Sequence, residues 1–255
     1  MRTSWLLLAA GLCGVLLAAC ASDTTSAPDD DDAVDAGAAD SSAPEAPQDW
    51  AALGHFAEAN AALPAPPTSG EARVVFMGNS ITEGWDHRYP EFFRAHPNWI
   101  NRGISGQTTP QMLVRFRPDV IDLAPEAVVI LAGINDIAGN TGPMTLEQTF
   151  GNLASMAQLA RANGIRVVLA SVLPAYDFPW SPGKAPAQKV VRLNAMLKDF
   201  AAATEGVSYL DYFTPMADGR PGLREGLHED EVHPLRAGYE LMRPLTEQAV
   251  SEALE

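Results

Sequence analysis

The run AVVILA at residues 127–132 is the most apolar of the strand-like segments in the chain, and it decides the fold class. Four other short runs rich in apolar residues share its character, at residues 73–77, 98–102, 165–173 and 207–210. Strands that are covered on both faces read as continuous apolar runs rather than as alternating ones. The five runs therefore predict a buried, parallel, five-stranded sheet.

Helical patterns separate these runs. Between the third and the fourth, apolar residues recur at helical spacing over residues 145–163, with Thr145 as a candidate N-cap. Residues 187–203 and 235–253 carry similar patterns. The alternation predicts an α/β protein, a three-layer α/β/α sandwich with a flavodoxin-like parallel sheet, in which sites form beyond the carboxyl ends of the strands.

The first twenty residues read as a targeting signal. Arg2 precedes an apolar run at residues 5–17, and Leu-Ala-Ala stands directly before Cys20. The run predicts a signal peptide over residues 1–19. The end of this segment resembles the lipobox of bacterial lipoproteins, which implies that Cys20 is lipidated and becomes the mature N-terminus. The alternatives are a plain secretory signal with Cys20 as an unmodified thiol, and a membrane-spanning helix, for which the run is short.

Residues 20–49 have the composition of a spacer. Nine acidic residues and no Lys or Arg occur between Asp23 and Asp49, including four consecutive Asp at residues 29–32. Such a segment cannot bury enough apolar surface to fold, so we predict an acidic, disordered tether. A calcium site at the Asp run is the alternative, but the glycine turn and ligand spacing of a calcium loop are missing. The folded domain is then expected at residues 50–255.

Charge and cysteine content exclude several functions. The chain has 17 basic and 32 acidic residues and a net charge of −15, so a nucleic-acid backbone would be repelled. Cys13 and Cys20 are the two cysteines, and both lie in the first twenty residues. The expected domain therefore has no disulfide, no thiol nucleophile and no Cys-ligated metal.

Polar residues follow the first three apolar runs. Ser80, in Gly-Asn-Ser directly after the first run, is expected at a helix N-terminus, where backbone N–H groups favour developing negative charge. Gly103 and Asn135 follow at the same sheet edge, and their N–H and amide groups could form an oxyanion hole with the Ser80 N–H. The alternatives are an ordinary helix cap at Ser80 and plain turn residues at the other two positions.

A candidate base lies near the C-terminus. Asp230 and His233 are three residues apart before the last helical pattern, so they can meet in one turn as the orienting carboxylate and the base of a serine nucleophile. A zinc-protease helix is not expected, because His228 and His233 are five apart and Pro234 follows. His228 is interpreted as a loop residue, and no role is assigned to His55, His87 or His96.

The aromatic side chains of Tyr176, Phe178 and Trp180 follow the fourth run. They could offer flat faces to a sugar ring or a wall to an acyl chain, or they could be loop packing.

The motifs together resemble the SGNH hydrolases, also called the GDSL lipase/acylhydrolase family, over about residues 73–255. The four name-giving residues match Ser80, Gly103, Asn135 and His233, and Asp230 matches the family's Asp-x-x-His. Residues 172–180 resemble a bacterial subgroup related to platelet-activating-factor acetylhydrolase-like enzymes. Asn79 departs from the family, which has Asp there.

The resemblance implies a serine esterase without metal or cofactor. Ser80 would be the nucleophile, His233 the base and Asp230 its orienting partner, with Ser80, Gly103 and Asn135 holding the oxyanion. With the lipid anchor at Cys20, we expect an extracytoplasmic enzyme on a bacterial membrane that removes short acyl groups, such as acetyl, from a carbohydrate or glycan. The alternatives are a short-chain acyl-lipid (lysophospholipase-like) hydrolase and a catalytically silent carbohydrate-binding module.

Overall fold

A computed structural model describes residues 48–255 of the chain. The predicted signal peptide, the predicted lipidation site at Cys20 and almost all of the predicted tether lie outside these residues. Asp49, the last residue assigned to the tether, lies inside. Its carboxylate accepts hydrogen bonds from the N–H groups of Leu53 (2.8 Å) and Gly54 (2.7 Å), so it belongs to the first folded turn.

Five parallel strands form one sheet in the order β2-β1-β3-β4-β5, which confirms the predicted sheet. The strands are β1 (Val74–Gly78), β2 (Trp99–Gly103), β3 (Ala127–Leu131), β4 (Arg166–Ala170) and β5 (Val207–Leu210). Every residue of β1 and β3 is buried, as expected for strands covered on both faces. The predicted fourth run extends to residue 173, but β4 ends at Ala170. Beyond it the backbone N–H and C=O of Val172 bond to the Asn194 side chain instead of a strand.

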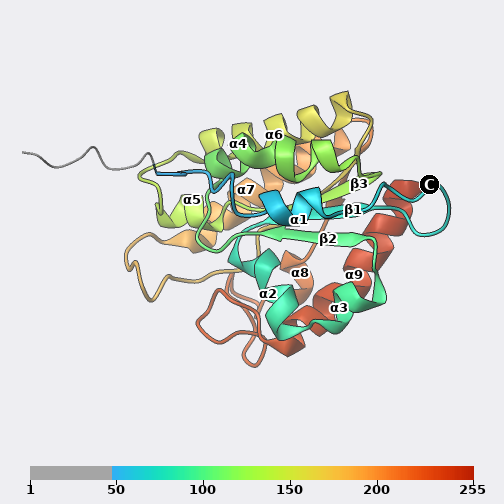
Figure 1. Cartoon of the computed structure of the whole chain (residues 1–255). Helices are drawn as coiled ribbons and strands as arrows, with labels where there is room; N and C mark the ends of the chain where they lie inside the picture. Colours follow the sequence, from blue (N-terminus) through green and yellow to red (C-terminus); the bar gives the residue numbers. More distant parts are fainter. Residues whose placement is uncertain (1–47) are drawn as a thin grey trace, which may run out of the picture. The chain divides into compact units, whose positions relative to one another are not determined.

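Helices cover both faces of the sheet, which confirms the three-layer architecture (Figure 1). One layer consists of α4 (Thr109–Asp119), α5 (Ile134–Ala138), α6 (Leu146–Ala162) and α7 (Pro186–Ala202). The other consists of α2 (Ser80–Arg88), α3 (Glu91–Ala95), α8 (Phe213–Met216) and α9 (Arg236–Leu254). The short helix α1 (Ala57–Ala61) lies beside α4, and a 3-10 turn (Ile121–Leu123) follows α4.

The three predicted helices form α6, α7 and α9, with ends within one residue of the expected ones. Thr145 caps α6 as expected: its side chain accepts the Gln148 N–H at 3.1 Å, and Gln148 returns the contact in a capping box. No helix within residues 48–255 is long and apolar enough to span a membrane.

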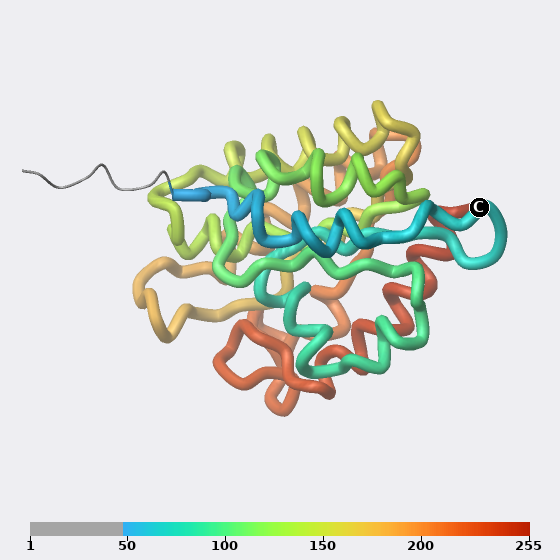
Figure 2. Tube along the Cα trace, viewed as in Figure 1, coloured from blue at the N-terminus to red at the C-terminus, as the bar shows by residue number. Residues whose placement is uncertain are grey.

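The carboxyl ends of the central strands place three loops side by side. Gly78, which ends β1, pairs in register with Gly103 of β2 and with Leu131 of β3. The strand order reverses at this point, which is where open α/β sheets bind ligands. The described chain begins at the same side of the sheet, where its blue segment runs along the green segment that carries α4 (Figure 2).

Candidate active site

Ser80 begins helix α2, directly after the β1 turn. Asn79 is the N-cap, and its Oδ1 accepts the Ile81 N–H at 3.0 Å. The alternative that Ser80 is an ordinary helix cap therefore does not hold, because the neighbouring residue does the capping. The Ser80 N–H, as the first of the helix, has no intrahelical acceptor.

The structure brings Ser80, His233 and Asp230 together in one hydrogen-bonded chain. Ser80 Oγ lies 2.9 Å from Nε2 of His233, and Nδ1 of the same ring lies 2.7 Å from Oδ2 of Asp230. The three side chains come from opposite ends of the folded chain, 153 residues apart in the case of Ser80 and His233. The arrangement is that of a nucleophile, a base and a carboxylate that orients the base.

Asp230 also shapes the turn that carries His233. Its Oδ1 accepts the N–H groups of His233 (2.7 Å) and Val232 (3.1 Å). Burial acts to raise the pKa of Asp230, but these two N–H groups and the His233 ring together outweigh it, so the pKa is lowered. A carboxylate held ionised beside an imidazole stabilises the imidazolium form.

His228 closes the same loop. Its Nδ1 accepts the N–H of Glu231 at 2.8 Å, and residues His228 and Pro234 form an antiparallel bridge. Glu231 between them has a positive φ of 69°. His228 is thus a loop residue, as predicted, and its contact with Glu231 has no signal in the sequence.

Gly103 does not have a free N–H group. As the last residue of β2 it donates to Oδ1 of Asn101 at 2.8 Å. A Cβ at this position would lie 2.2 Å from the backbone N of Glu83, so glycine is required by the close approach of α2 to β2. This corrects the prediction that Gly103 supplies an oxyanion donor, because its donor is already engaged.

Gly106, three residues further on, has the property expected of Gly103. It is exposed and its φ is +76°, a conformation that favours glycine. Within residues 48–255 its N–H has no hydrogen-bond acceptor, while its carbonyl is held by Nδ2 of Asn140 at 3.1 Å. The sequence contains both glycines in the motif Gly-Ile-Ser-Gly, and the side-chain contact of Asn101 distinguishes them.

Asn135 lies in helix α5 and is buried. Its Nδ2 donates to the carbonyl oxygen of Gln107 at 2.9 Å. An amide nitrogen carries two hydrogens, so one is left for another acceptor. The contact joins the turn after β3 to the loop after β2, two of the three places where the sequence predicted oxyanion donors.

A cavity of about 360 Å³ opens at Ser80 and His233. Its lining is dominated by polar and charged side chains, among them Glu83, His87 and Arg88, and by Ser105 from the loop after β2. Arg88 forms an ion pair with Glu229 at its edge. Pro234 and Tyr239 are the lining residues with sizeable apolar groups, so a long acyl chain would find few apolar side chains to contact.

The three predicted aromatic residues divide among three environments. Trp180 is half-exposed, and its ring centroid lies 6.0 Å from that of His233. Phe178 is fully buried and packs against Trp180. Tyr176 lines a second cavity of about 470 Å³, where the guanidinium of Arg220 lies over its ring at 5.1 Å. Trp180 is therefore the aromatic residue of this set beside the candidate catalytic chain.

Comparison with known proteins places the chain in a class. The profile of the GDSL-like Lipase/Acylhydrolase family matches residues 76–241. The chain belongs to this family of acylhydrolases, enzymes that act on carboxylic ester bonds. The resemblance found in the sequence motifs is thereby confirmed.

Two curated relatives match parts of the chain. Esterase TesA of Pseudomonas aeruginosa is 31% identical over 156 residues, 61% of this chain and 65% of that protein. The uncharacterized lipoprotein YqeF of Bacillus subtilis is 35% identical over 121 residues, 41% of this chain and 50% of that protein. The matched part thus spans half to about two thirds of the length of these relatives.

Solved structures share the fold. A GDSL-like lipase from Bacteroides thetaiotaomicron is 48% identical, with a TM-score of 0.76 over 80% of this chain and 99% of that chain. A structure described as that of a platelet activating factor from Streptococcus pneumoniae is 22% identical, with a TM-score of 0.64 over 80% of this chain and 91% of that chain. An acetylxylan esterase from Geobacillus stearothermophilus is 18% identical, with a TM-score of 0.56 over 72% of this chain and 96% of that chain. At such identities the last two indicate the fold alone.

Proposed function

We propose that this protein is a serine esterase in which Ser80 is the nucleophile. The observation that carries the proposal is the 2.9 Å contact between Ser80 Oγ and His233 Nε2, continued by the 2.7 Å contact to Asp230. His233 takes the proton from Ser80 as Oγ attacks the ester carbonyl, and then gives it to the leaving alcohol. Water, activated by His233 in turn, releases the acid from the acyl-enzyme.

Three donors stabilise the negative charge on the carbonyl oxygen: the N–H groups of Ser80 and Gly106 and the amide of Asn135. Gly106 takes the place of Gly103 in this assignment, because the Gly103 N–H bonds to Asn101. Donors that are fixed before the reaction stabilise the transition state without reorganising.

The substrate is a short-chain ester, most simply an acetyl ester on a carbohydrate or glycan. The polar and charged lining of the cavity at Ser80 favours a substrate with a short acyl group and a polar alcohol. The half-exposed ring of Trp180 beside His233 supports a sugar ring as that alcohol, because aromatic faces bury the apolar face of a sugar while its hydroxyls stay hydrated. A short-chain acyl-lipid hydrolase is the second candidate, supported by the anchor expected at Cys20, which would hold the site near a bilayer.

The enzyme works outside the cytoplasm, anchored to a bacterial membrane through Cys20, with its substrate at the cell surface or in the periplasm. The lipobox-like residues 17–20 and the acidic composition of the predicted tether support this location. The relation to a lipoprotein, YqeF, is consistent with it.

Hydrolysis of nitrophenyl esters of increasing acyl length tests the proposal, with Ser80→Ala as control. We expect activity that is highest with acetyl and falls steeply beyond butyryl, and none in the variant. Activity that rises with chain length would favour the lipid hydrolase. Absence of hydrolysis in the folded wild type would favour a silent carbohydrate-binding module.

A Trp180→Ala variant separates the two substrate classes. The KM for an acetylated oligosaccharide should rise while the constants for nitrophenyl acetate stay nearly unchanged. Tyr176→Ala is the matched control, because Tyr176 lines the other cavity and should leave both substrates unaffected. Equal effects of Trp180→Ala on both substrates would contradict a role in binding the sugar.

A further inference from the structure

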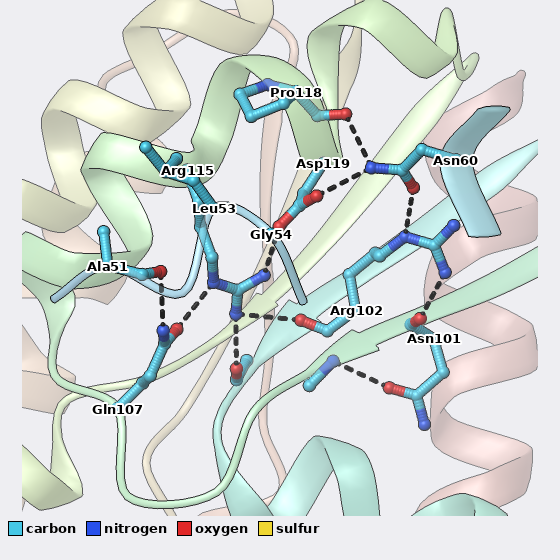
Figure 3. A network of polar contacts seen from close by, with 12 residues as sticks. Ala51, Leu53, Gly54, Asn60, Asn101, Arg102, Gln107, Arg115, Pro118 and Asp119 are labelled. Carbon is cyan, nitrogen blue, oxygen red and sulfur yellow. Dashed lines mark hydrogen bonds and ion pairs between the residues drawn. The ribbon is translucent and has the colours of Figure 1, made fainter. Parts of the chain in front are cut away.

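A network of buried polar groups lies beneath the loop that follows β2 (Figure 3). We call residues 104–108 the oxyanion loop and residues 50–60, which precede the part matched by the family profile, the N-terminal segment. Arg115 of α4, fully buried, is the centre of the network. No sequence motif pointed to it.

Arg115 bonds to both strand ends that carry the candidate site. Its Nη2 donates to the carbonyl oxygens of Gly78 (3.0 Å) and Arg102 (2.9 Å), at the ends of β1 and β2. Its Nη1 donates to Asp119 at 3.0 Å, and its Nε to Oε1 of Gln107 at 2.6 Å. One side chain therefore fixes the turn before Ser80 relative to the oxyanion loop.

Gln107 links this guanidinium to two further parts of the chain. Its Nε2 donates to the carbonyl oxygen of Ala51 at 3.0 Å, and its own backbone carbonyl accepts the Asn135 amide. Gln107, which orients Asn135, is thus held by Arg115 and by the Ala51 carbonyl oxygen of the N-terminal segment.

The N-terminal segment contacts the network at two more points. Nδ2 of Asn60 donates to Asp119 at 2.8 Å, and its Oδ1 accepts from Nε of Arg102 at 2.8 Å. The ring of Phe56 covers the guanidinium of Arg102 at 4.7 Å and lies 6.0 Å from that of Arg115. In Figure 3, Ala51 and Asn60 of this segment lie on opposite sides of the Arg115 guanidinium.

The burial of two cations explains why such a cover is needed. Burial lowers the pKa of Arg115 and lowers that of Arg102 to about 10, and Asp119 is the carboxylate within the network that opposes this effect on both. Buried charges are stable only when they are paired and hydrogen-bonded. The Asn60 amide oxygen of the N-terminal segment supplies one of these hydrogen bonds, to Arg102, and the Ala51 carbonyl oxygen holds Gln107, which in turn accepts from Arg115.

We propose that the N-terminal segment is a positioning element of the active site, which holds the oxyanion loop and Asn135 in register with Ser80 through Gln107 and Arg115. The proposal rests on the proposed function for its effect on catalysis. It adds a structural role for residues that lie outside the family's matched region and touch none of the reacting atoms.

Two variants of the full chain test it. Gln107→Ala removes the bonds to Arg115 and Ala51 but keeps the backbone carbonyl that Asn135 uses, and Asn60→Ala acts from the N-terminal segment alone. Displacements of about 1 Å in a catalytic group can cost up to about 100-fold in rate. For both variants we expect a kcat about 10-fold lower for nitrophenyl acetate with little change in KM. Gln248→Ala, on the exposed face of α9, is the matched control and should leave kcat unchanged.

Amide hydrogen exchange gives a readout that does not depend on activity. The Ile104 N–H donates to the carbonyl oxygen of Gly78, and the Gln107 N–H donates to that of Ile104. The exchange rates of these two amides therefore report whether the oxyanion loop is held in place. Both variants should accelerate exchange at these two amides. Unchanged exchange in a folded Gln107→Ala would overturn the proposal, as would faster exchange with unchanged kcat.

If the wild type hydrolysed no ester, the proposed function would fail, and amide exchange would still show whether the N-terminal segment holds the oxyanion loop. Should Asn60→Ala fail to fold, Gln107→Ala decides.

Discussion

The side-chain amide of Asn135 donates to the backbone carbonyl of Gln107 at 2.9 Å, and this bond joins the turns that follow β3 and β2. The two turns meet because Gly78 of β1 pairs in register with both Gly103 of β2 and Leu131 of β3. The fold thus brings Asn135 and the oxyanion loop to one sheet edge, and the hydrogen bond fixes one amide hydrogen while the other stays available.

Removal of the Asn135 amide should act on turnover. Loss of one oxyanion donor in other enzymes costs about 10²–10³ in kcat, or about 3–4 kcal/mol, and we expect a loss of this size for Asn135→Ala. The rate of nitrophenyl acetate hydrolysis and the circular dichroism of the variant check this. A folded Asn135→Ala variant with wild-type kcat would show that Asn135 is not part of the oxyanion hole.

Asp230→Asn should separate orientation of the base from substrate binding. The change retains the shape but removes the charge that stabilises the His233 cation, and loss of the corresponding charge in serine proteases lowers kcat about 10⁴-fold. We expect a decrease approaching that size with KM nearly unchanged. A large rise in KM at constant kcat is the result that this assignment does not allow.

The lowered pKa of Asp230 predicts that the stability of the protein depends on pH. The folded-state pKa of Asp230 is lowered, so its contribution to the free energy of unfolding is fully present above its ordinary pKa near 4 and is lost as the pH falls through the lowered value. The stability difference between the wild type and Asp230→Asn, measured by urea denaturation, should therefore shrink below about pH 4. A difference that stays constant from pH 6 to pH 3 would contradict the lowered pKa.

Substitution of Gly103 and of Gly106 should have different effects on turnover. Gly103→Ala places a Cβ against the backbone of Glu83, and such overpacking costs about 1–3 kcal/mol of stability. Gly106→Ala meets no neighbouring atom, although its positive φ costs about 1–2 kcal/mol. Both variants keep the backbone N–H, but alanine disfavours the positive φ that sets the direction of the N–H at 106. We therefore expect the first variant to lose mainly thermal stability and the second to lose turnover beyond its loss of stability. If Gly103→Ala lost turnover beyond its loss of stability and Gly106→Ala did not, the oxyanion donor would be the Gly103 N–H.

The lipid anchor is tested by mass spectrometry of the mature protein from its native host. Diacylglycerol on Cys20, with no residue before it, is the expected result. A free N-terminus at Ala21 or later, in protein released from the membrane fraction, would rule out lipidation at Cys20.

Much of the fold could be predicted because its buried strands are continuous apolar runs. The capped helix after Thr145 was equally visible, since its apolar spacing and its capping box are local features. Helix α4 was not predicted, because it carries Arg115 and Asp119 in fully buried positions and Pro118 inside the helix. Their burial depends on partners in β1, β2 and the N-terminal segment, and no local pattern reveals that.

The candidate site was predicted as far as its parts lie in short motifs. Asp230 and His233 are three residues apart, so their contact follows from the sequence spacing. The choice between Gly103 and Gly106 depends on a bond from the backbone to the Asn101 side chain, and the separation of Tyr176 from Trp180 depends on how one loop folds. Both are properties of the packed structure.

Reaction with a fluorophosphonate tests the central claim most directly, because the reagent modifies only an activated serine. We predict that peptide mapping finds the label on Ser80 alone, that labelling disappears in Ser80→Ala, and that it proceeds slowly in Asn135→Ala, which keeps the nucleophile and its base. Ester hydrolysis that is abolished by chelators while the reagent leaves both Ser80 and the activity untouched would contradict the account.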